Sequence, residues 1–145
     1  MMTIVRRLGQ KKYFANVFFT LVGIILPLSS FAAWSTQRPE GSSPFGYWNT
    51  LALGSDQHPR IVYRDGSAGG NLRFLRWTGV LWEKETIESS FDSNGGYASL
   101  ALTPTGTPWV SYYKTGFGLR FASKDGPSWT IKTIDGQGGQ YSSLK

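Results

Sequence analysis

The stretch Tyr97–Tyr113, "YASLALTPTGTPWVSYY", decides the fold because the chain contains a version of it twice. An earlier stretch, Tyr47–Tyr63 ("YWNTLALGSDQHPRIVY"), has the same order of a short apolar run, a turn and a second apolar run. The segment Tyr141–Lys145, "YSSLK", begins the pattern again. A segment that recurs along a chain indicates a repeat architecture, so the fold follows from what one copy can form.

The two long copies stay in phase over two blocks. In the first block equivalent residues are 49 apart: Thr50–Leu53 and Ser99–Leu102, Pro59 and Pro108, Tyr63 and Tyr112. A shorter loop in the second copy then reduces the spacing to 47: Leu72–Phe74 and Leu119–Phe121, Trp82 and Trp129, Ile87 and Ile134. We take Tyr47 and Tyr97 as the starts of the copies. A period in the high forties is typical of a β-propeller blade.

Each copy predicts four strands. Alternating apolar and polar residues, rich in aromatic and β-branched side chains, suit a pleated sheet, and Pro and Gly mark the turns between the runs. In the second copy the expected strands are Ser99–Leu102, Pro108–Tyr113, Leu119–Ser123 and Trp129–Ile134. After the first 32 residues no segment shows helical periodicity.

The expected fold is therefore all-β, with two four-stranded antiparallel propeller-type blades and the start of a third. Blade 1 spans about 47–96, blade 2 about 97–140, and the start of blade 3 is 141–145. Polar, glycine-rich links at 88–96 and 135–140 fit the crossing from the outer strand of one blade to the inner strand of the next. The alternative is a meander that is not a propeller, with these links as surface loops.

The segments "GGYASLALTPTGTPWVSYYK", "GLRFAS" and "SWTIKTID" resemble the secreted bacterial β-propeller repeats of the sialidase-like and Asp-box-like group. The resemblance covers about 47–145. It implies a propeller architecture outside the cytoplasm, but it does not imply one activity, because such propellers include both enzymes and binding proteins.

Residues 1–32 have the three parts of a secretory signal peptide, and we expect this segment to be helical. A basic region is followed by an apolar run, Tyr13–Leu28, and then by small residues that include Ser30 and Ala32. We expect cleavage after Ala32 and an exported product: periplasmic, on the cell surface or secreted. The alternative is a retained membrane anchor. In either case a linker at 33–46 precedes the repeats.

Charge and cysteine content exclude some functions. The formal net charge is +6, but beyond the leader eleven basic residues face nine acidic ones. No basic stripe that would bind phosphates remains there, so we expect no nucleic-acid partner. The chain has no cysteine, which excludes disulfides and thiolate catalysis.

One turn resembles a contracted Asp-box, "SKDGPSW". Its matching residues are Ser123, Asp125, Gly126 and Trp129, and the resemblance implies a structural role in which the carboxylate binds turn N–H groups and the indole packs beneath. The alternative is an ordinary Asp-Gly turn.

We expect no catalytic residues, no metal and no cofactor. The resemblance implies that a sialidase would need three arginines around one carboxylate, a Tyr–Glu nucleophile and an aspartic acid, and no such set is evident. Arg73 and Arg120 are equivalent, which indicates a repeated structural role. Charged residues on the outer strand, Glu83, Glu85 and Glu88, are expected to protect an exposed edge. His58 and Asp56 lack further metal ligands.

Most aromatics recur at equivalent positions, as packing between blades requires. Trp109 and Tyr113 break this rule because they stand where the first copy has Arg60 and Arg64. They alternate onto the same face of one strand, so they are the candidate ligand-binding residues.

Two blades leave broad apolar faces uncovered, whereas propellers close with about four to eight blades. Either several chains associate through these faces, or the sequence is a truncated part of a longer array. The expected function is that of an exported, non-catalytic module that binds a carbohydrate or a cell-surface protein. The alternatives are a fragment of a sialidase-like glycoside hydrolase and a truncated product without independent activity.

Overall fold

The computed structural model describes residues 35–39, 46–66, 70–89 and 96–145. The expected leader at 1–32, its helix and most of the linker at 33–46 lie outside these residues. From Thr36 onward the chain forms one compact unit, Thr36–Lys145. Within the described ranges there is no helix with the length and apolarity needed to span a bilayer.

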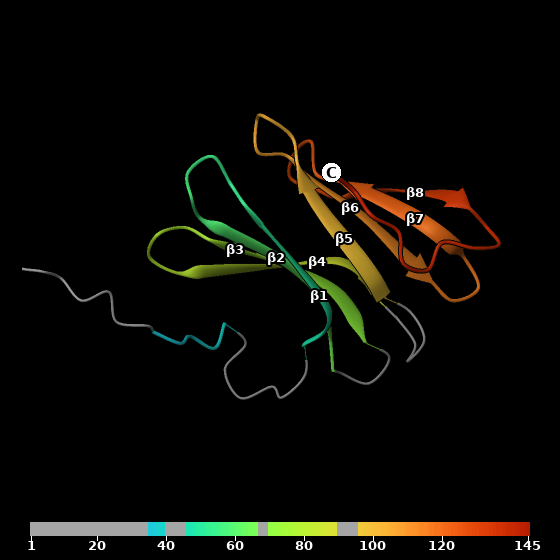
Figure 1. Cartoon of the computed structure of the whole chain (residues 1–145), viewed down its shortest axis with the longest axis horizontal. Helices are drawn as coiled ribbons and strands as arrows, with labels where there is room; N and C mark the ends of the chain where they lie inside the picture. Colours follow the sequence, from blue (N-terminus) through green and yellow to red (C-terminus); the bar gives the residue numbers. More distant parts are fainter. Residues whose placement is uncertain (1–34, 40–45, 67–69, 90–95) are drawn as a thin grey trace, which may run out of the picture. The chain divides into compact units, whose positions relative to one another are not determined.

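The described residues form eight strands and no helix, which confirms the predicted all-β class. Two antiparallel four-stranded sheets follow the chain order without crossovers, and Figure 1 shows them as separate layers. The N-terminal sheet contains β1 (Gly46–Leu53), β2 (Pro59–Asp65), β3 (Asn71–Trp77) and β4 (Trp82–Ser89). The C-terminal sheet contains β5 (Gly96–Leu102), β6 (Pro108–Lys114), β7 (Gly118–Ser123) and β8 (Thr130–Asp135).

The two sheets are copies of each other down to their irregularities. The β1–β2 register shifts between Tyr47 and Thr50, and the β5–β6 register shifts at the equivalent place. The β3–β4 register shifts between Leu72 and Arg73, and the β7–β8 register does so at the residues 47 further on. Such bulges bend a strand at a fixed position. The repeat in the sequence is therefore a repeat of detailed backbone geometry.

The bulge corrects the predicted start of the first copy. Trp48, not Tyr47, is equivalent to Tyr97, because both have a left-handed backbone, with φ of 54° and 49°. Tyr141 has the same conformation, with φ of 59°. A positive φ is rare for large side chains, so its recurrence marks one position in each copy. The matching of Tyr47 with Tyr97 was wrong by one residue, and the spacing of 49 in this block already pairs Trp48 with Tyr97.

These three residues form an aromatic ladder, defined as Trp48, Tyr97 and Tyr141. The ring centroids of Trp48 and Tyr97 are 4.3 Å apart, and those of Tyr97 and Tyr141 are 4.5 Å apart. Each ring therefore rests on the equivalent ring of the next copy.

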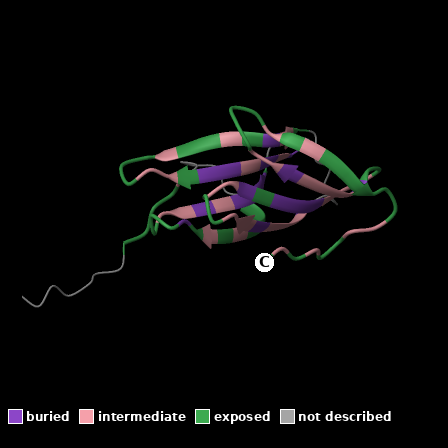
Figure 2. Ribbon diagram, turned by 90° about the horizontal axis from the view of Figure 1, so that it is seen from above, coloured by how far each residue is buried: buried purple, intermediate pink, exposed green. Residues whose placement is uncertain are grey.

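The core lies between the two sheets. β5 runs beside β1 and β2, and Figure 2 shows buried residues, in purple, on strands of both sheets. The N-terminal sheet contributes Val62, Leu72, Phe74 and Ile87, and the C-terminal sheet contributes Leu100, Val110, Tyr112 and Ala122. Burial of one such aliphatic or aromatic side chain stabilises a fold by about 1.5–3 kcal/mol.

The two facing sides are not equivalent. Val62 in β2 corresponds to Ser111 in β6, yet the C-terminal sheet packs through Val110, which points to the opposite side of the strand from Ser111. We call the packed side of the C-terminal sheet its near face and the side with Trp109, Ser111 and Tyr113 its far face. The far face is thus the counterpart of the face that the N-terminal sheet buries, and the packing is head-to-tail.

Gly96, at the bulge of β5, gives a test of this arrangement. Its φ is +139°, and a Cβ there would lie 2.4 Å from Cδ1 of Trp48. We expect Gly96→Ala to lower the free energy of unfolding by about 2 kcal/mol or more, through strain and displacement of the indole. Gly136→Ala is the control, because its Cβ would meet no atom within 4 Å. Urea denaturation should place the control within about 0.5 kcal/mol of the parent chain; equal losses would contradict the ladder packing.

Candidate functional site

The junction between the sheets contains a cluster of charged groups around Glu88, at the end of β4. Its carboxylate accepts a hydrogen bond from the Tyr112 hydroxyl at 2.6 Å and an ion-paired bond from Nζ of Lys114 at 2.7 Å. Arg120 also donates to it. The Glu88 and Lys114 side chains are each 13% exposed, and that of Arg120 is 15% exposed. Two cations and a phenol of one sheet therefore neutralise one carboxylate of the other.

Tyr112 acts as a hydrogen-bond donor in this cluster. Burial, and then its hydrogen bond to Glu88, raise the pKa of Tyr112 above its ordinary value, so the phenol keeps its proton. The residue is 0% exposed. A Tyr–Glu pair is what the sialidase-like resemblance implies for a nucleophile, but here the hydroxyl lies inside a packed interface that a substrate does not reach.

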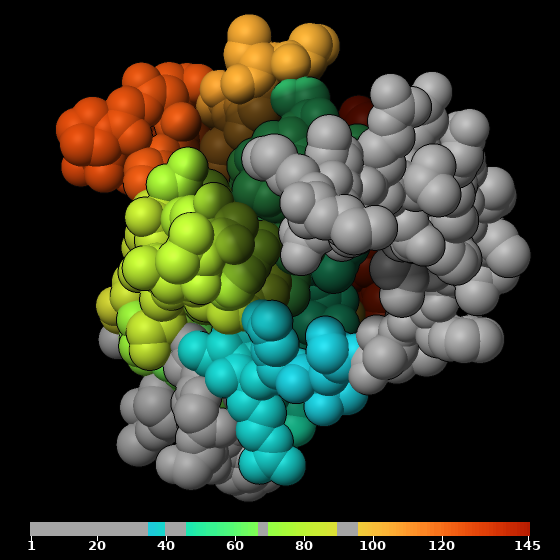
Figure 3. All heavy atoms as spheres, turned by 90° about the vertical axis from the view of Figure 1, so that its left-hand side faces the viewer, coloured from blue at the N-terminus to red at the C-terminus, as the bar shows by residue number. Residues whose placement is uncertain are grey.

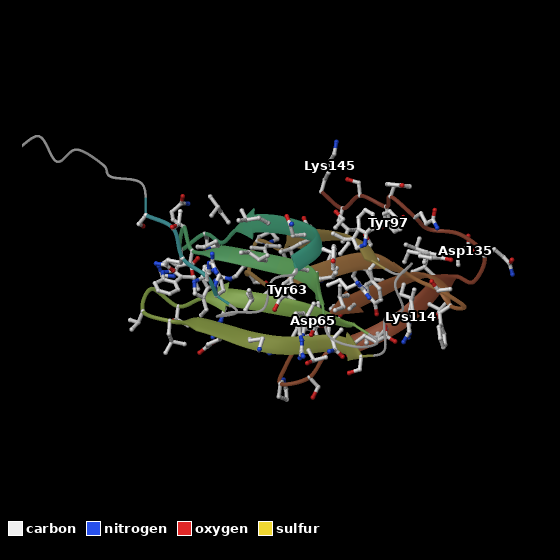
Figure 4. The ribbon with its side chains drawn as sticks, turned by 90° about the horizontal axis from the view of Figure 1, so that it is seen from below. Tyr63, Asp65, Tyr97, Lys114, Asp135 and Lys145 are labelled. Atoms are coloured by element: carbon white, nitrogen blue, oxygen red, sulfur yellow. The ribbon has the colours of Figure 1, made fainter. Side chains whose placement is uncertain are left out.

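The N-terminal sheet neutralises its own equivalent arginine internally. Arg73, the counterpart of Arg120, donates from Nε to Oδ2 of Asp65 at 2.8 Å. Asp65 lies at the position that Lys114 holds in the second copy, 49 residues further on; both side chains are labelled in Figure 4. The carboxylate therefore comes from the same sheet in the first copy and from the preceding sheet in the second.

A second polar link joins the sheets through Glu85. The indole N–H of Trp129 donates to Oε2 of Glu85 at 3.1 Å, and Lys124 forms an ion pair with the same carboxylate. The Trp129 ring also packs edge-on against Phe74, with centroids 5.4 Å apart.

The equivalent tryptophan of the first copy, Trp82, has its partner in the segment before β1. The indole N–H of Trp82 donates to Oε1 of Gln37 at 2.9 Å, and Figure 3 shows residues 35–39 in cyan against the N-terminal sheet. Residues 35–39 thus supply, for the first copy, the acceptor that Glu85 supplies for the second.

The Asp-box-like residues lie at the β7–β8 turn, and the structural role that the resemblance implies for them stays a prediction. The Ser123 hydroxyl donates to Asp125 at 3.1 Å, and Gly126 is exposed. Trp129 follows the turn, and its ring packs on Phe74 of the other sheet. Its packing therefore contributes to the junction between sheets.

A polar cleft of about 400 Å³ opens between the β1–β2 turn and the β5–β6 and β7–β8 turns. Its charged lining groups are paired: Arg60 with Asp56, Lys124 with Glu85, and Arg76 with a carboxylate outside the lining, Glu83. Hydrogen bonds, first from Arg60 and then from the His58 N–H, lower the pKa of Asp56 to about 2. Donors and acceptors in this cleft are thus abundant while its net charge is small.

Nδ1 of His58 lies 3.5 Å from Oδ2 of Asp56. In the ranges that the structure describes, no three His, Cys, Asp or Glu side chains come together as metal ligands. The Asp56 carboxylate instead forms an ion pair with Arg60, with Nη2 and Oδ2 2.8 Å apart.

Trp109 and Tyr113 lie on the far face of the C-terminal sheet, on the same side of β6 as predicted from their spacing. Trp109 is 44% exposed, and its ring packs edge-on against Phe121. Tyr113 is half-buried, with its ring 6.5 Å from that of Tyr97. Neither residue lines the polar cleft. Their role in ligand binding stays a prediction.

The expected edge-protecting role of Glu83, Glu85 and Glu88 holds only for Glu83, whose side chain is 44% exposed. Glu85 and Glu88 instead bridge to the other sheet, because β4 is covered by the C-terminal sheet at these residues. The sequence contains one signal for this bridge. Arg73 is retained as Arg120 while Asp65 is replaced by Lys114, so the second copy needs a carboxylate from elsewhere.

Comparison with family models and with curated proteins gives no match. The resemblance to sialidase-like and Asp-box-like propeller repeats therefore stays an expectation drawn from the residues.

Glu88→Gln tests the charged junction. It leaves Lys114 and Arg120 without their carboxylate, so we expect the free energy of unfolding to fall by about 3 kcal/mol in urea denaturation. Glu83→Gln is the matched control, since it removes the same charge from the same strand in an exposed pair with Arg76. Its effect should stay below about 1 kcal/mol. Similar losses of unfolding free energy for the two variants would show that the Glu88 cluster stabilises the fold no more than an exposed ion pair does.

Proposed function

We propose that the chain is an exported, non-catalytic β-propeller-type repeat module that binds a glycan or a protein outside the cytoplasm. The observation that carries the proposal is the head-to-tail packing of two sheets with the same strand order and the same bulges. A scaffold of this kind displays turns and sheet faces at regular intervals, which suits recognition. Export rests on the leader at 1–32, and a membrane anchor is the alternative if the leader is retained.

The ionisable groups support a non-catalytic role. Every carboxylate among the described residues accepts a hydrogen bond or an ion pair within the protein: Asp56, Asp65, Glu83, Glu85, Glu88, Asp125 and Asp135. Four arginines bind four different carboxylates, whereas a sialidase needs three arginines around one substrate carboxylate: Arg60, Arg73, Arg76 and Arg120.

A glycan is the ligand class that the surface favours. The polar cleft is lined by both hydrogen-bond donors and acceptors, and its positive and negative side chains nearly balance. Such a lining matches a polyhydroxylated ligand better than a strongly ionic one. Away from the cleft, on the far face of the C-terminal sheet, the exposed indole of Trp109 offers a flat apolar surface of the kind on which a sugar ring stacks.

A fluorogenic sialoside assay tests the absence of catalysis. We expect no turnover above the blank, because Tyr112 is inaccessible and Glu88 is held by two cations. Turnover that Tyr112→Phe abolishes would overturn the non-catalytic proposal.

A glycan array tests the binding proposal. We expect the chain to bind a subset of glycans, and Trp109→Ala and Tyr113→Ala to weaken that binding about fivefold or more. The control is Val80→Ala, a change at a residue that is 83% exposed in the β3–β4 turn. Binding that survives both aromatic substitutions would remove these residues from the site, and an array without signal would contradict the glycan ligand.

A further inference from the structure

The far face of the C-terminal sheet carries the counterparts of the residues that the N-terminal sheet buries against its neighbour. Ile134 is the counterpart of Ile87, but Ile134 is 61% exposed and Ile87 is 5% exposed. Phe121 and Leu119 are half-buried, whereas their counterparts Phe74 and Leu72 are 4% and 0% exposed. The difference arises because the N-terminal sheet has a neighbouring sheet on this face.

The segment after β8 already lies on the far face in the way that β5 lies on the N-terminal sheet. The Tyr141 ring rests on Tyr97 at 4.5 Å, as Tyr97 rests on Trp48. The hydroxyls of Ser142 and Ser111 are 2.8 Å apart, and the Leu144 N–H donates to Ser99 at 2.9 Å. These contacts reach β5 and β6, just as β5 contacts β1 and β2. Residues 141–144 thus follow the path of a first strand of another copy.

The C-terminal sheet also has a counterpart of Glu88, the carboxylate that accepts hydrogen bonds between the two sheets. Asp135 is the counterpart of Glu88, at the end of β8 as Glu88 is at the end of β4. It is exposed and accepts the backbone N–H of Gln137 in its own turn at 2.9 Å. Figure 4 labels it together with Lys114, which belongs to the set that Glu88 binds. A carboxylate is therefore in place for the Tyr, Lys and Arg of a following copy.

The opposite end of the stack is arranged differently. The outer side of the N-terminal sheet has Arg73 neutralised by Asp65 and Trp82 satisfied by Gln37. Tyr63 and Leu75, on the same side, are only 4% and 3% exposed. This side is therefore a poor receptor for another sheet, which disfavours a second copy of this chain as the occupant of the far face.

We infer that the far face of the C-terminal sheet is the docking surface for one further β-sheet of this same repeat, and that Asp135 binds its tyrosine, lysine and arginine as Glu88 does at the existing junction. This inference rests on the repeat architecture of the proposed function. A docked sheet would cover Trp109 and Tyr113, so it competes with glycan binding at these two residues. The occupant's first strand follows residues 141–144, and its near face carries apolar residues that cover Phe121 and Ile134.

The test extends the chain by one copy. A second 97–145 segment replaces residues 141–145, so that the added sheet carries its own counterparts of Tyr112, Lys114 and Arg120. We expect the extended chain to unfold in urea as one transition, with a larger m-value because more surface is buried. Asp135→Asn should lower the folding equilibrium constant about tenfold or more in the extended chain and leave that of the original chain unchanged. Asp125→Asn, a charge removal in the β7–β8 turn, should have the same small effect in both.

An added copy that stays unfolded, or that unfolds separately and without dependence on Asp135, overturns the inference. Light scattering on the original chain supplies a second measurement. A concentration-dependent dimer that Phe121→Lys abolishes would assign the far face to a second copy of this chain and would equally overturn it. Because neither experiment involves a glycan or a sialoside, failure here is distinguishable from failure of the proposed function.

Discussion

The contact between the two sheets pairs one face of a repeat with the opposite face of the next, and the other features of the structure follow from this polarity. A symmetric contact would bury the same face twice and would end at two sheets. A head-to-tail contact instead leaves each stack with two different ends. At the N-terminal sheet Asp65 and Gln37 supply the acceptors that Glu88 and Glu85 supply for the C-terminal sheet. The C-terminal end carries the segment 141–145 on its far face.

The junction combines two kinds of interaction with different roles. The apolar contacts between Val62, Phe74, Leu100 and Val110 supply attraction, but they are not directional. The Glu88 cluster tolerates little displacement, because a shift of the sheets would leave two cations and a carboxylate poorly solvated and unpaired. The charged cluster therefore fixes the register of sheets that apolar packing holds together.

The sequence predicted the strands well because strand alternation is local. Tyr63 and Tyr112, or Phe74 and Phe121, reveal the register without any knowledge of tertiary contacts. Alternation also placed Trp109 and Tyr113 on one face. The start of the first copy was missed by one residue, because the two tyrosines were matched by residue type although the spacing of 49 pairs Trp48 with Tyr97. The sequence does not indicate which face packs, since both sides of each sheet carry apolar residues.

The charged residues show the limit of sequence reasoning more clearly. Glu85 and Glu88 look like edge protection on β4 alone, and only the position of the C-terminal sheet makes them partners of Trp129, Lys114 and Arg120. An ion pair between residues 26 or 32 positions apart leaves no periodic trace. The replacement of Asp65 by Lys114 beside a retained arginine was the one visible sign.

The matched bulges have a consequence for how such a chain changes over evolutionary time. If the far face receives a further sheet, an in-frame duplication of one copy adds a segment whose receiving surface is already present on its predecessor. The new segment then needs an acidic residue at the end of its predecessor's last strand, where Asp135 already lies. Lineages that carry this repeat can therefore gain or lose copies by unequal recombination, and neighbouring copies should be more alike than distant ones.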